Sequence, residues 1–252
     1  MQAYGEKFAR VYNRKWAGFA ERIGPYILSF YQDAPARQRN NAVLDLCCGT
    51  GQLAVQFLER GYKVVGIDLS PHMLRYAREN AKRFIDEGQA RFLQADASNF
   101  ALDERFGLVV STYDSLNHLE DELALRQCFQ CVFAVLEKDG YFVFDLNTRL
   151  GLVRWNNITV DEGDETVVVT RGIYDGESDK AWTRITGFIR TRDNLYERFE
   201  ETAFNTVFDV PRVRNALLDI GWREVHFARI QDLRTPIEKP EEEGRVFFVA
   251  QK

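Results

Sequence analysis

The sequence predicts an α/β fold, namely a doubly wound, mostly parallel seven-stranded sheet with a small antiparallel β insert. Through the first 148 of the 252 residues, short apolar segments alternate with segments of helical periodicity, which is the pattern of a parallel sheet. A glycine turn, Gly49-Thr50-Gly51, follows the first of these strands. After residue 148 the chain changes to long alternating runs with turn signals, which are typical of antiparallel strands.

The first predicted strand, residues 43–46, carries a carboxylate, Asp45, four positions before the glycine turn begins. Glycine lacks a Cβ, so Gly49 and Gly51 allow a tight turn and a close approach of a ligand to main-chain N–H groups. The second strand, residues 63–67, ends in Asp68, 23 positions after Asp45. A βαβ unit places an acid at this point against the hydroxyls of a ribose, so the spacing indicates a site for a nucleoside cofactor.

Two further strands end in polar residues. The run 90–95 stops at Asp96-Ala97, and the run 106–111 stops at Thr112-Tyr113-Asp114. In an open parallel sheet a ligand lies across the carboxyl ends of the strands, so we expect the four strand endings to share one rim. A fifth strand, residues 141–146, follows a turn at Asp139-Gly140.

The segment before the first strand has apolar residues at helical spacing and predicts one amphipathic N-terminal helix. These residues are Tyr4, Phe8, Val11, Tyr12, Trp16, Phe19 and Ile23. A second helix begins at Ser70-Pro71, where a capping hydroxyl precedes a proline in the first turn.

Residues 149–205 are predicted to form the insert, with three antiparallel strands between residues 165 and 205. The chain then returns to the main domain, which comprises residues 1–148 and 206–252. There it forms a helix at 211–218 and two closing strands at 222–230 and 245–250. One strand face of the insert carries Trp182, Arg184, Phe188 and Arg190. This face either roofs a pocket, with arginines that read an anion, or is solvated, and we favour the solvated face.

The composition is that of an ordinary soluble enzyme. A net charge of −5, from 33 basic and 38 acidic residues, disfavours nucleic acid as a partner. No apolar run approaches the length of a membrane span, and the first residues lack the apolar core of a secretory signal, so we expect a cytoplasmic protein. Cys128 and Cys131 lie at the core spacing of a predicted helix, and no His/Cys cluster completes a tetrahedral set. We therefore expect neither a metal site nor disulfides.

The set Asp45-x-x-x-Gly49-x-Gly51, Asp68, Asp96-Ala97 and the Tyr113 loop resembles the class I S-adenosylmethionine-dependent methyltransferases, over residues 40–148 and again at the C-terminus. The similarity is greatest to small-molecule N-methyltransferases of the amino-sugar or glycine type. It implies that the glycine turn lies under the methionine part of the cofactor, that Asp68 holds the ribose diol, and that Asp96 and the Ala97 N–H read the adenine edge. The implied cofactor-binding residues are Asp45, Cys47, Gly49, Gly51, Asp68, Leu69, Met73, Asp96, Ala97, Thr112 and Tyr113.

The resemblance also implies two catalytic residues. His118 follows the fourth strand and is the candidate base, because an unperturbed imidazole titrates near ~6.5; otherwise it merely begins the next helix. Residues 1–35 correspond to a helical lid in similar enzymes, which would put the Tyr12 phenol near the sulfonium, with Tyr4 as a further candidate. The same aromatic residues also fit a simple packing stripe.

The predicted function is S-adenosylmethionine-dependent methyl transfer to a small soluble acceptor, and N-methylation is favoured over O-methylation. We expect a monomer or homodimer, with the insert on the acceptor side. One alternative is a module that binds the cofactor without catalysis. The other is a nicotinamide-dependent oxidoreductase, because Gly49-x-Gly51-x-x-Ala54 approximates a dinucleotide fingerprint. Asp45 argues against the oxidoreductase, since it would repel a pyrophosphate.

Overall fold

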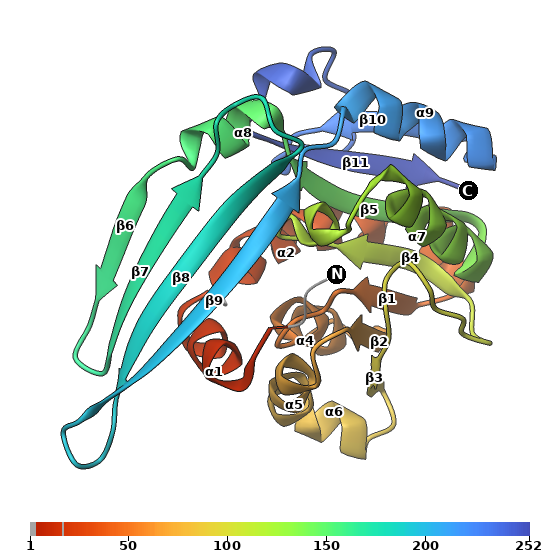
Figure 1. Ribbon diagram of the computed structural model, residues 1–252. Helices are drawn as coiled ribbons and strands as arrows, with labels where there is room; N and C mark the ends of the chain where they lie inside the picture. Colours follow the sequence, from red (N-terminus) through yellow and green to blue (C-terminus); the bar gives the residue numbers. More distant parts are fainter. Residues whose placement is uncertain (1–3, 17) are drawn as a thin grey trace.

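The computed structural model describes residues 4–16 and 18–252. Its larger sheet has seven strands in the order β10-β11-β5-β4-β1-β2-β3 (Figure 1). Strands β1 to β5 are parallel, whereas β11 runs antiparallel to both of its neighbours. The strands are β1 Ala42–Leu46, β2 Lys63–Asp68, β3 Ala90–Gln94, β4 Phe106–Ser111, β5 Leu136–Asn147, β10 Glu224–Ala228 and β11 Arg245–Gln251. The predicted fold class is confirmed.

Helices cover both faces of this sheet and bury the alternating side chains of its strands. Val43, Val64 and Val110 pack against α2, α4 and α5, while Leu44 and Val109 pack on the opposite face against α7 and α9. The helices are α1 Glu6–Lys15, α2 Gly18–Gln32, α3 Pro35–Arg39, α4 Gln52–Glu59, α5 Pro71–Asn80, α6 Lys82–Asp86, α7 Glu122–Val135, α8 Arg149–Arg154 and α9 Val210–Ile220, with short 3₁₀ turns η1 Ser115–His118 and η2 Pro240–Glu242.

The predicted single N-terminal helix is wrong in one respect, because the structure has two helices there. The first, α1, ends at Trp16, whose φ of −107° and ψ of 3° leave the helical region. The second, α2, buries Ile23, Ile27 and Tyr31 in the core beside the sheet. Only α1 therefore remains a candidate lid within the predicted range 1–35, and residues 1–3 of that range lie outside the described residues.

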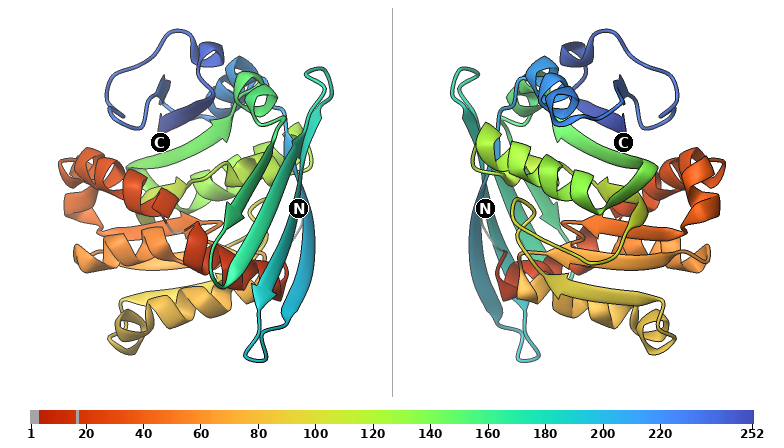
Figure 2. Two further views of the ribbon diagram at one scale, coloured as in Figure 1. Left: turned by 90° about the vertical axis from the view of Figure 1, so that its left-hand side faces the viewer. Right: turned by 90° about the vertical axis from the view of Figure 1, so that its right-hand side faces the viewer.

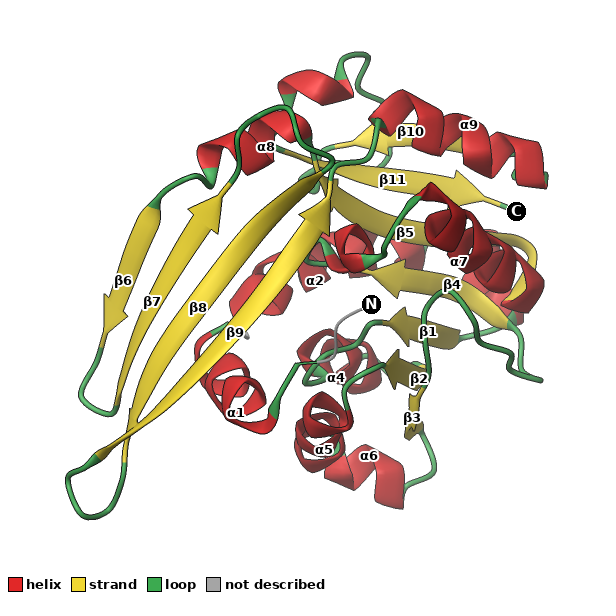
Figure 3. Cartoon of the chain, in the orientation of Figure 1, coloured by secondary structure: helices red, strands yellow, loops and turns green. Residues whose placement is uncertain are grey.

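The insert forms a separate antiparallel sheet in the order β6-β7-β8-β9 (Figure 3). Its strands are β6 Ile158–Glu162, β7 Thr166–Ile173, β8 Lys180–Arg190 and β9 Tyr196–Thr206. The sequence predicted three strands here and missed β6, whose five residues are all exposed.

The helix α1 lies between the insert and the main domain (Figure 2). Its Phe8 and Val11 form a small apolar cluster with Met73 of α5 and with Ile185 and Phe199 of the insert. The two sheets are thus joined on this side by the aromatic face of one ten-residue helix.

The face of β8 that carries Trp182 and Arg184 points to solvent, which confirms the solvated-face interpretation. Trp182 is 43% exposed, and Arg184 makes an ion pair of 2.7 Å with Glu200. The inner face presents the neighbouring Thr183 and Ile185 instead. No helix among residues 4–16 and 18–252 is long and apolar enough to span a bilayer.

Candidate functional site

A cavity of about 290 Å³ lies between the carboxyl ends of the parallel strands, α1 and the inner face of the insert. Three groups of residues line it. The first belongs to α1 and its two flanks and comprises Tyr4, Phe8, Tyr12 and Trp16. The main domain contributes Cys47, Gly49, Asp68, Leu69, Met73, Tyr113, Asp114, Ser115 and His118, and the insert contributes Trp155, Thr159, Thr170, Thr183, Ile185, Ala203 and Asn205. Eight of the predicted site residues are therefore brought together: Tyr12, Cys47, Gly49, Asp68, Leu69, Met73, Tyr113 and His118.

A smaller cavity of about 40 Å³ adjoins the first and shares Tyr12, Cys47 and Tyr113 with it. It adds Asp45 and Thr112 of the predicted set. Gly51, Asp96 and Ala97 line neither cavity. Gly51 instead faces α5, since a Cβ on it would lie 3.0 Å from the Cβ of Ala77. Gly51 therefore serves helix packing rather than direct contact.

The glycine turn between β1 and α4 is held in place by Asp68, the last residue of β2. Gly49 and Gly51 have φ values of +55° and +81°, a region that glycine enters without steric cost. The Gly49 N–H donates to Asp68 Oδ2 at 2.8 Å, and Asp68 Oδ1 accepts from the Ser70 N–H at 2.9 Å. This corrects one expectation, because the Gly49 N–H is used within the protein and does not face a ligand. Burial raises the pKa of Asp68 above its ordinary value.

Asp45 is a buried carboxylate with an unsatisfied oxygen. Within the described part of the chain, its Oδ2 has no hydrogen-bond partner. Burial, together with the charge of Asp68, raises the pKa of Asp45 to about 8. A buried carboxylate is costly unless it is paired, so this position at the edge of the small cavity suits a cationic group of a ligand.

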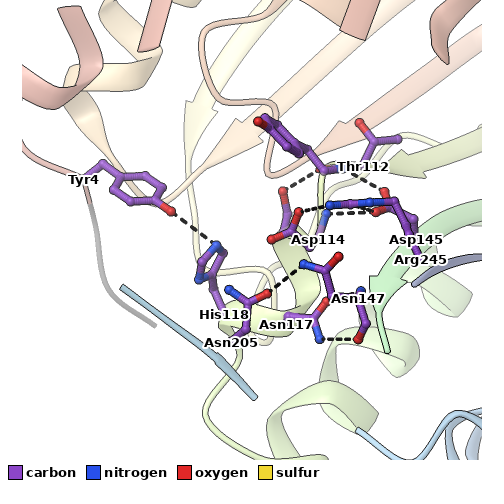
Figure 4. Close-up of polar contacts among 11 residues, drawn as sticks. Tyr4, Thr112, Asp114, Asn117, His118, Asp145, Asn147, Asn205 and Arg245 are labelled. Atoms are coloured by element: carbon purple, nitrogen blue, oxygen red, sulfur yellow. Dashed lines mark hydrogen bonds and ion pairs between the residues drawn. The ribbon is translucent and has the colours of Figure 1, made fainter. Parts of the chain in front are cut away.

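The loop after β4 is held by a cluster of three charged residues that we name the Asp145 clamp: Asp114, Asp145 and Arg245 (Figure 4). Asp145 accepts the Tyr113 N–H at 2.7 Å and the Asp114 N–H at 3.0 Å. Arg245 bridges the two carboxylates, with its Nη2 2.6 Å from Asp114 Oδ1. Tyr113 and Asp114 have φ values of +65° and +49°, which is unfavourable for such residues. The clamp therefore maintains a strained loop.

Arg245 also connects this loop to α2. Its guanidinium lies 5.1 Å from the ring centre of Phe19 and 5.7 Å from that of Tyr113, and the two rings stack with centres 4.2 Å apart. Burial by itself would lower the pKa of Arg245, but Asp145 and Asp114 more than offset it, so the guanidinium stays charged.

His118 lies on the cavity wall in η1, before α7 begins, so it is not the first residue of the next helix. Its Nδ1 is 2.6 Å from the carbonyl oxygen of Phe204, which can only accept, so Nδ1 carries the proton. The lone pair of Nε2 is then directed at the Tyr4 hydroxyl, 3.2 Å away. Burial raises the pKa of Tyr4 far above its ordinary value, so Tyr4 donates to His118.

The turn that carries His118 is anchored by a buried amide that the sequence analysis missed. Asn117 donates to the Thr206 carbonyl at 2.9 Å and accepts the Asn147 N–H at 2.9 Å. Asn147 in turn donates to Asn205 Oδ1 at 3.2 Å, and Asn205 faces the cavity. The chain Asn117-Asn147-Asn205 therefore holds η1, β5 and β9 in fixed relative positions. Asn117 lies between Leu116 and His118, and Asn147 follows the apolar run 141–146, so neither has a local pattern that indicates its role.

A family model described as a methyltransferase domain matches residues 43–140. The Bacillus subtilis protein YqeM, whose name assigns it provisionally to the methyltransferases, is 30% identical over 212 residues, which is 83% of each chain. The chain belongs to the S-adenosylmethionine-dependent methyltransferases. This methyltransferase is also 32% identical over 151 residues, 57% of its length and 50% of the relative's, to a glycine/sarcosine N-methyltransferase of Parasynechococcus marenigrum.

A solved S-adenosylmethionine-dependent methyltransferase from Clostridium acetobutylicum has the same fold, with a TM-score of 0.77 at 24% identity and 97% of both chains covered. This solved structure bears on the fold alone. As a member of the methyltransferase family, the chain is an enzyme that uses S-adenosylmethionine, as the resemblance implied. The alternatives of a non-catalytic module and of a nicotinamide-dependent oxidoreductase are set aside. The unpaired Asp45 carboxylate and the glycine turn braced by Asp68 are consistent with a cationic nucleoside cofactor.

Proposed function

We propose that this methyltransferase methylates the nitrogen of a small soluble amine, which lies between His118 and the inner face of the insert. The observation that carries the proposal is the His118 tautomer, whose Nε2 lone pair accepts from the Tyr4 hydroxyl at the cavity wall. An amine must lose a proton on methylation, and a fixed imidazole lone pair can accept it. The N-methyltransferase relative agrees with this choice. O-methylation is the second candidate.

We assign the residues that bind the cofactor from the cavities that they line. Asp45 would hold the ammonium group of the methionine part, and Asp68 the ribose hydroxyls, while Leu69 and Met73 pack against the adenine. Asp96 and Ala97 remain proposed for the adenine edge, although they lie outside both cavities. When bound, S-adenosylmethionine supplies an electrophilic methyl group on a sulfonium. The division into a main domain, an insert and a lid, and the cytoplasmic location, are likewise proposals.

The protein contributes alignment, exclusion of water and a proton acceptor to this reaction. Tyr12 lines both cavities, and its ring would attract the sulfonium of the bound cofactor by a cation–π contact worth roughly 0.5–2 kcal/mol. The Tyr4 hydroxyl donates a hydrogen bond to Nε2 of His118, and the acceptor amine would displace this hydroxyl when it binds. The Asp145 clamp keeps Tyr113 and Asp114 beside the acceptor.

The test is the chemical identity of the product. The enzyme is incubated with S-adenosylmethionine carrying a deuterated methyl group and, in separate reactions, with an amine, a carboxylic acid and a phenol of similar size. We expect deuterated methyl on nitrogen, located by fragmentation in mass spectrometry. Methyl on oxygen alone would reject the proposal in favour of O-methylation.

A further inference from the structure

We propose that three threonines on the inner face of the insert, Thr159, Thr170 and Thr183, select an acceptor amine that carries several hydroxyl groups and no carboxylate or phosphate. The inference rests on the proposed function and names the chemical class of the acceptor. We call these residues the threonine set.

The threonine set occupies one patch of the inner face, one residue from each of β6, β7 and β8. Thr159 lies directly opposite Thr170 in the register of β6 and β7. Thr183 lies opposite Gly172, so it is diagonal to Thr170 on the same face. Side chains at such cross-strand positions are neighbours, at about 5 to 8 Å. The three side chains therefore line one patch of the cavity across three strands, within reach of a single ligand.

These hydroxyls are available to a ligand. Within the described residues, none of the three makes a hydrogen bond to the protein, although all three line the cavity. Thr206 is buried and behaves differently, because its Oγ1 donates to the Leu119 carbonyl at 2.6 Å. Asn205 adds an amide group at the same wall, with its Oδ1 already held by Asn147. The wall therefore offers hydroxyl and amide groups that match the hydroxyls of a substrate.

The charge of the cavity excludes anionic acceptors. Its described lining contains no lysine or arginine and includes two carboxylates, Asp68 and Asp114. Three cations of the surrounding elements are engaged in ion pairs: Lys15 with Asp161 at 2.8 Å, Lys180 with Glu120, and Arg245 within the Asp145 clamp. A carboxylate or phosphate on the acceptor would lose its hydration without gaining a cationic partner.

The experiment compares four amines as methyl acceptors: D-glucosamine, its 6-phosphate, cyclohexylamine and glycine. S-adenosylhomocysteine release is measured at pH 8, and kcat/KM is expressed per unprotonated amine. Thr170→Val and Thr183→Val remove a hydroxyl but keep the branched shape. Thr186→Val is the matched control, because Thr186 lies on the outer face of the same strand as Thr183.

We expect D-glucosamine to exceed each of the other three amines by at least roughly tenfold in kcat/KM, since a site built to bind hydroxyls rejects analogues that lack them. Thr170→Val and Thr183→Val should each raise the KM for D-glucosamine by roughly 3- to 10-fold. Their kcat, their affinity for S-adenosylmethionine and the rate with cyclohexylamine should stay unchanged. Thr186→Val should behave as the wild type.

Two results would overturn the inference. Equal or better turnover of glycine or of the 6-phosphate would show that the site accepts anions. Unchanged KM in both cavity variants would remove the threonine set from recognition. With either of these two results, methyl transfer to any of the amines would still support the proposed N-methyltransferase function. Absence of transfer to every amine, with S-adenosylmethionine still bound, would reject both.

Discussion

At the scale of single residues, Asp45 is our proposed partner for the ammonium group of the cofactor, and its protonation state would control that contact. Its pKa of about 8 in the folded protein compares with 3.8 ordinarily. Below pH 8 the carboxylate therefore binds a proton that a cationic ligand must displace. We expect the affinity for S-adenosylmethionine to fall by about tenfold for each pH unit below 8. Calorimetric titration of the wild type and of Asp45→Asn at pH 6, 7 and 8 checks this. A pH dependence that persists in Asp45→Asn would assign it to another group.

The same pKa shift has a consequence for stability. Because the folded pKa is raised, the unliganded protein loses stability as the pH rises from about 4 to 8, the window in which only the folded state holds this proton. Asp45→Asn should therefore melt roughly 10 °C or more above the wild type at pH 8.5, because a shift of about four pKa units corresponds to on the order of 5 kcal/mol. At pH 4 the two should melt together. Thermal melts at the two pH values give the comparison, and an equal difference at both would contradict the assigned pKa.

Arg245 differs from a surface cation because both of its partners are buried carboxylates. Arg245→Met would leave Asp114 and Asp145 without a counter-charge, so we expect a loss of about 3–5 kcal/mol in unfolding free energy. Arg245→Lys keeps the charge but not the bidentate geometry and should lose less. Urea unfolding measures both variants, with Arg234→Met as an exposed control. A loss in Arg245→Met no larger than in this control would show that the clamp is not stabilising.

At the scale of secondary structure, α1 and α2 differ in how they are held. The polar contacts of α1 are mostly exposed ion pairs, such as Lys7 with Glu197 and Arg14 with Glu165, and such pairs contribute little. The apolar residues of α2 lie in the main core. The aromatic face of α1, in contrast, lines the cavity. We therefore propose α1 alone as the lid that admits the cofactor.

Hydrogen exchange tests this proposal. Amides of residues 6–15 should exchange quickly in the unliganded protein and slowly with S-adenosylhomocysteine, whereas those of residues 23–31 should be protected in both states. The second helix is thus an internal control. Equal protection of both helices without ligand would make α1 a fixed part of the structure and remove Tyr12 from any gating role.

At the scale of the whole molecule, local patterns predicted the main sheet but not the contacts that complete the site. The glycine turn, Asp68 and the loop to His118 follow strands whose apolar runs are visible in the sequence. The Asp145 clamp is different, because β11 places Arg245 opposite Asn147 and thus beside residues about one hundred positions earlier. No local pattern indicates that register. Asp96 and Ala97 show the converse, since their spacing matched the family and yet they line neither cavity.

The two sheets and α1 enclose one cavity, and the central claim is that an amine gives up its proton to His118 there. The most direct measurement is single-turnover methyl transfer to one amine acceptor by the wild type and by His118→Gln, each saturated with S-adenosylmethionine. The account predicts a rate about 10²-fold lower in His118→Gln, with the affinity for S-adenosylmethionine unchanged. An unaltered rate of transfer in His118→Gln would contradict it.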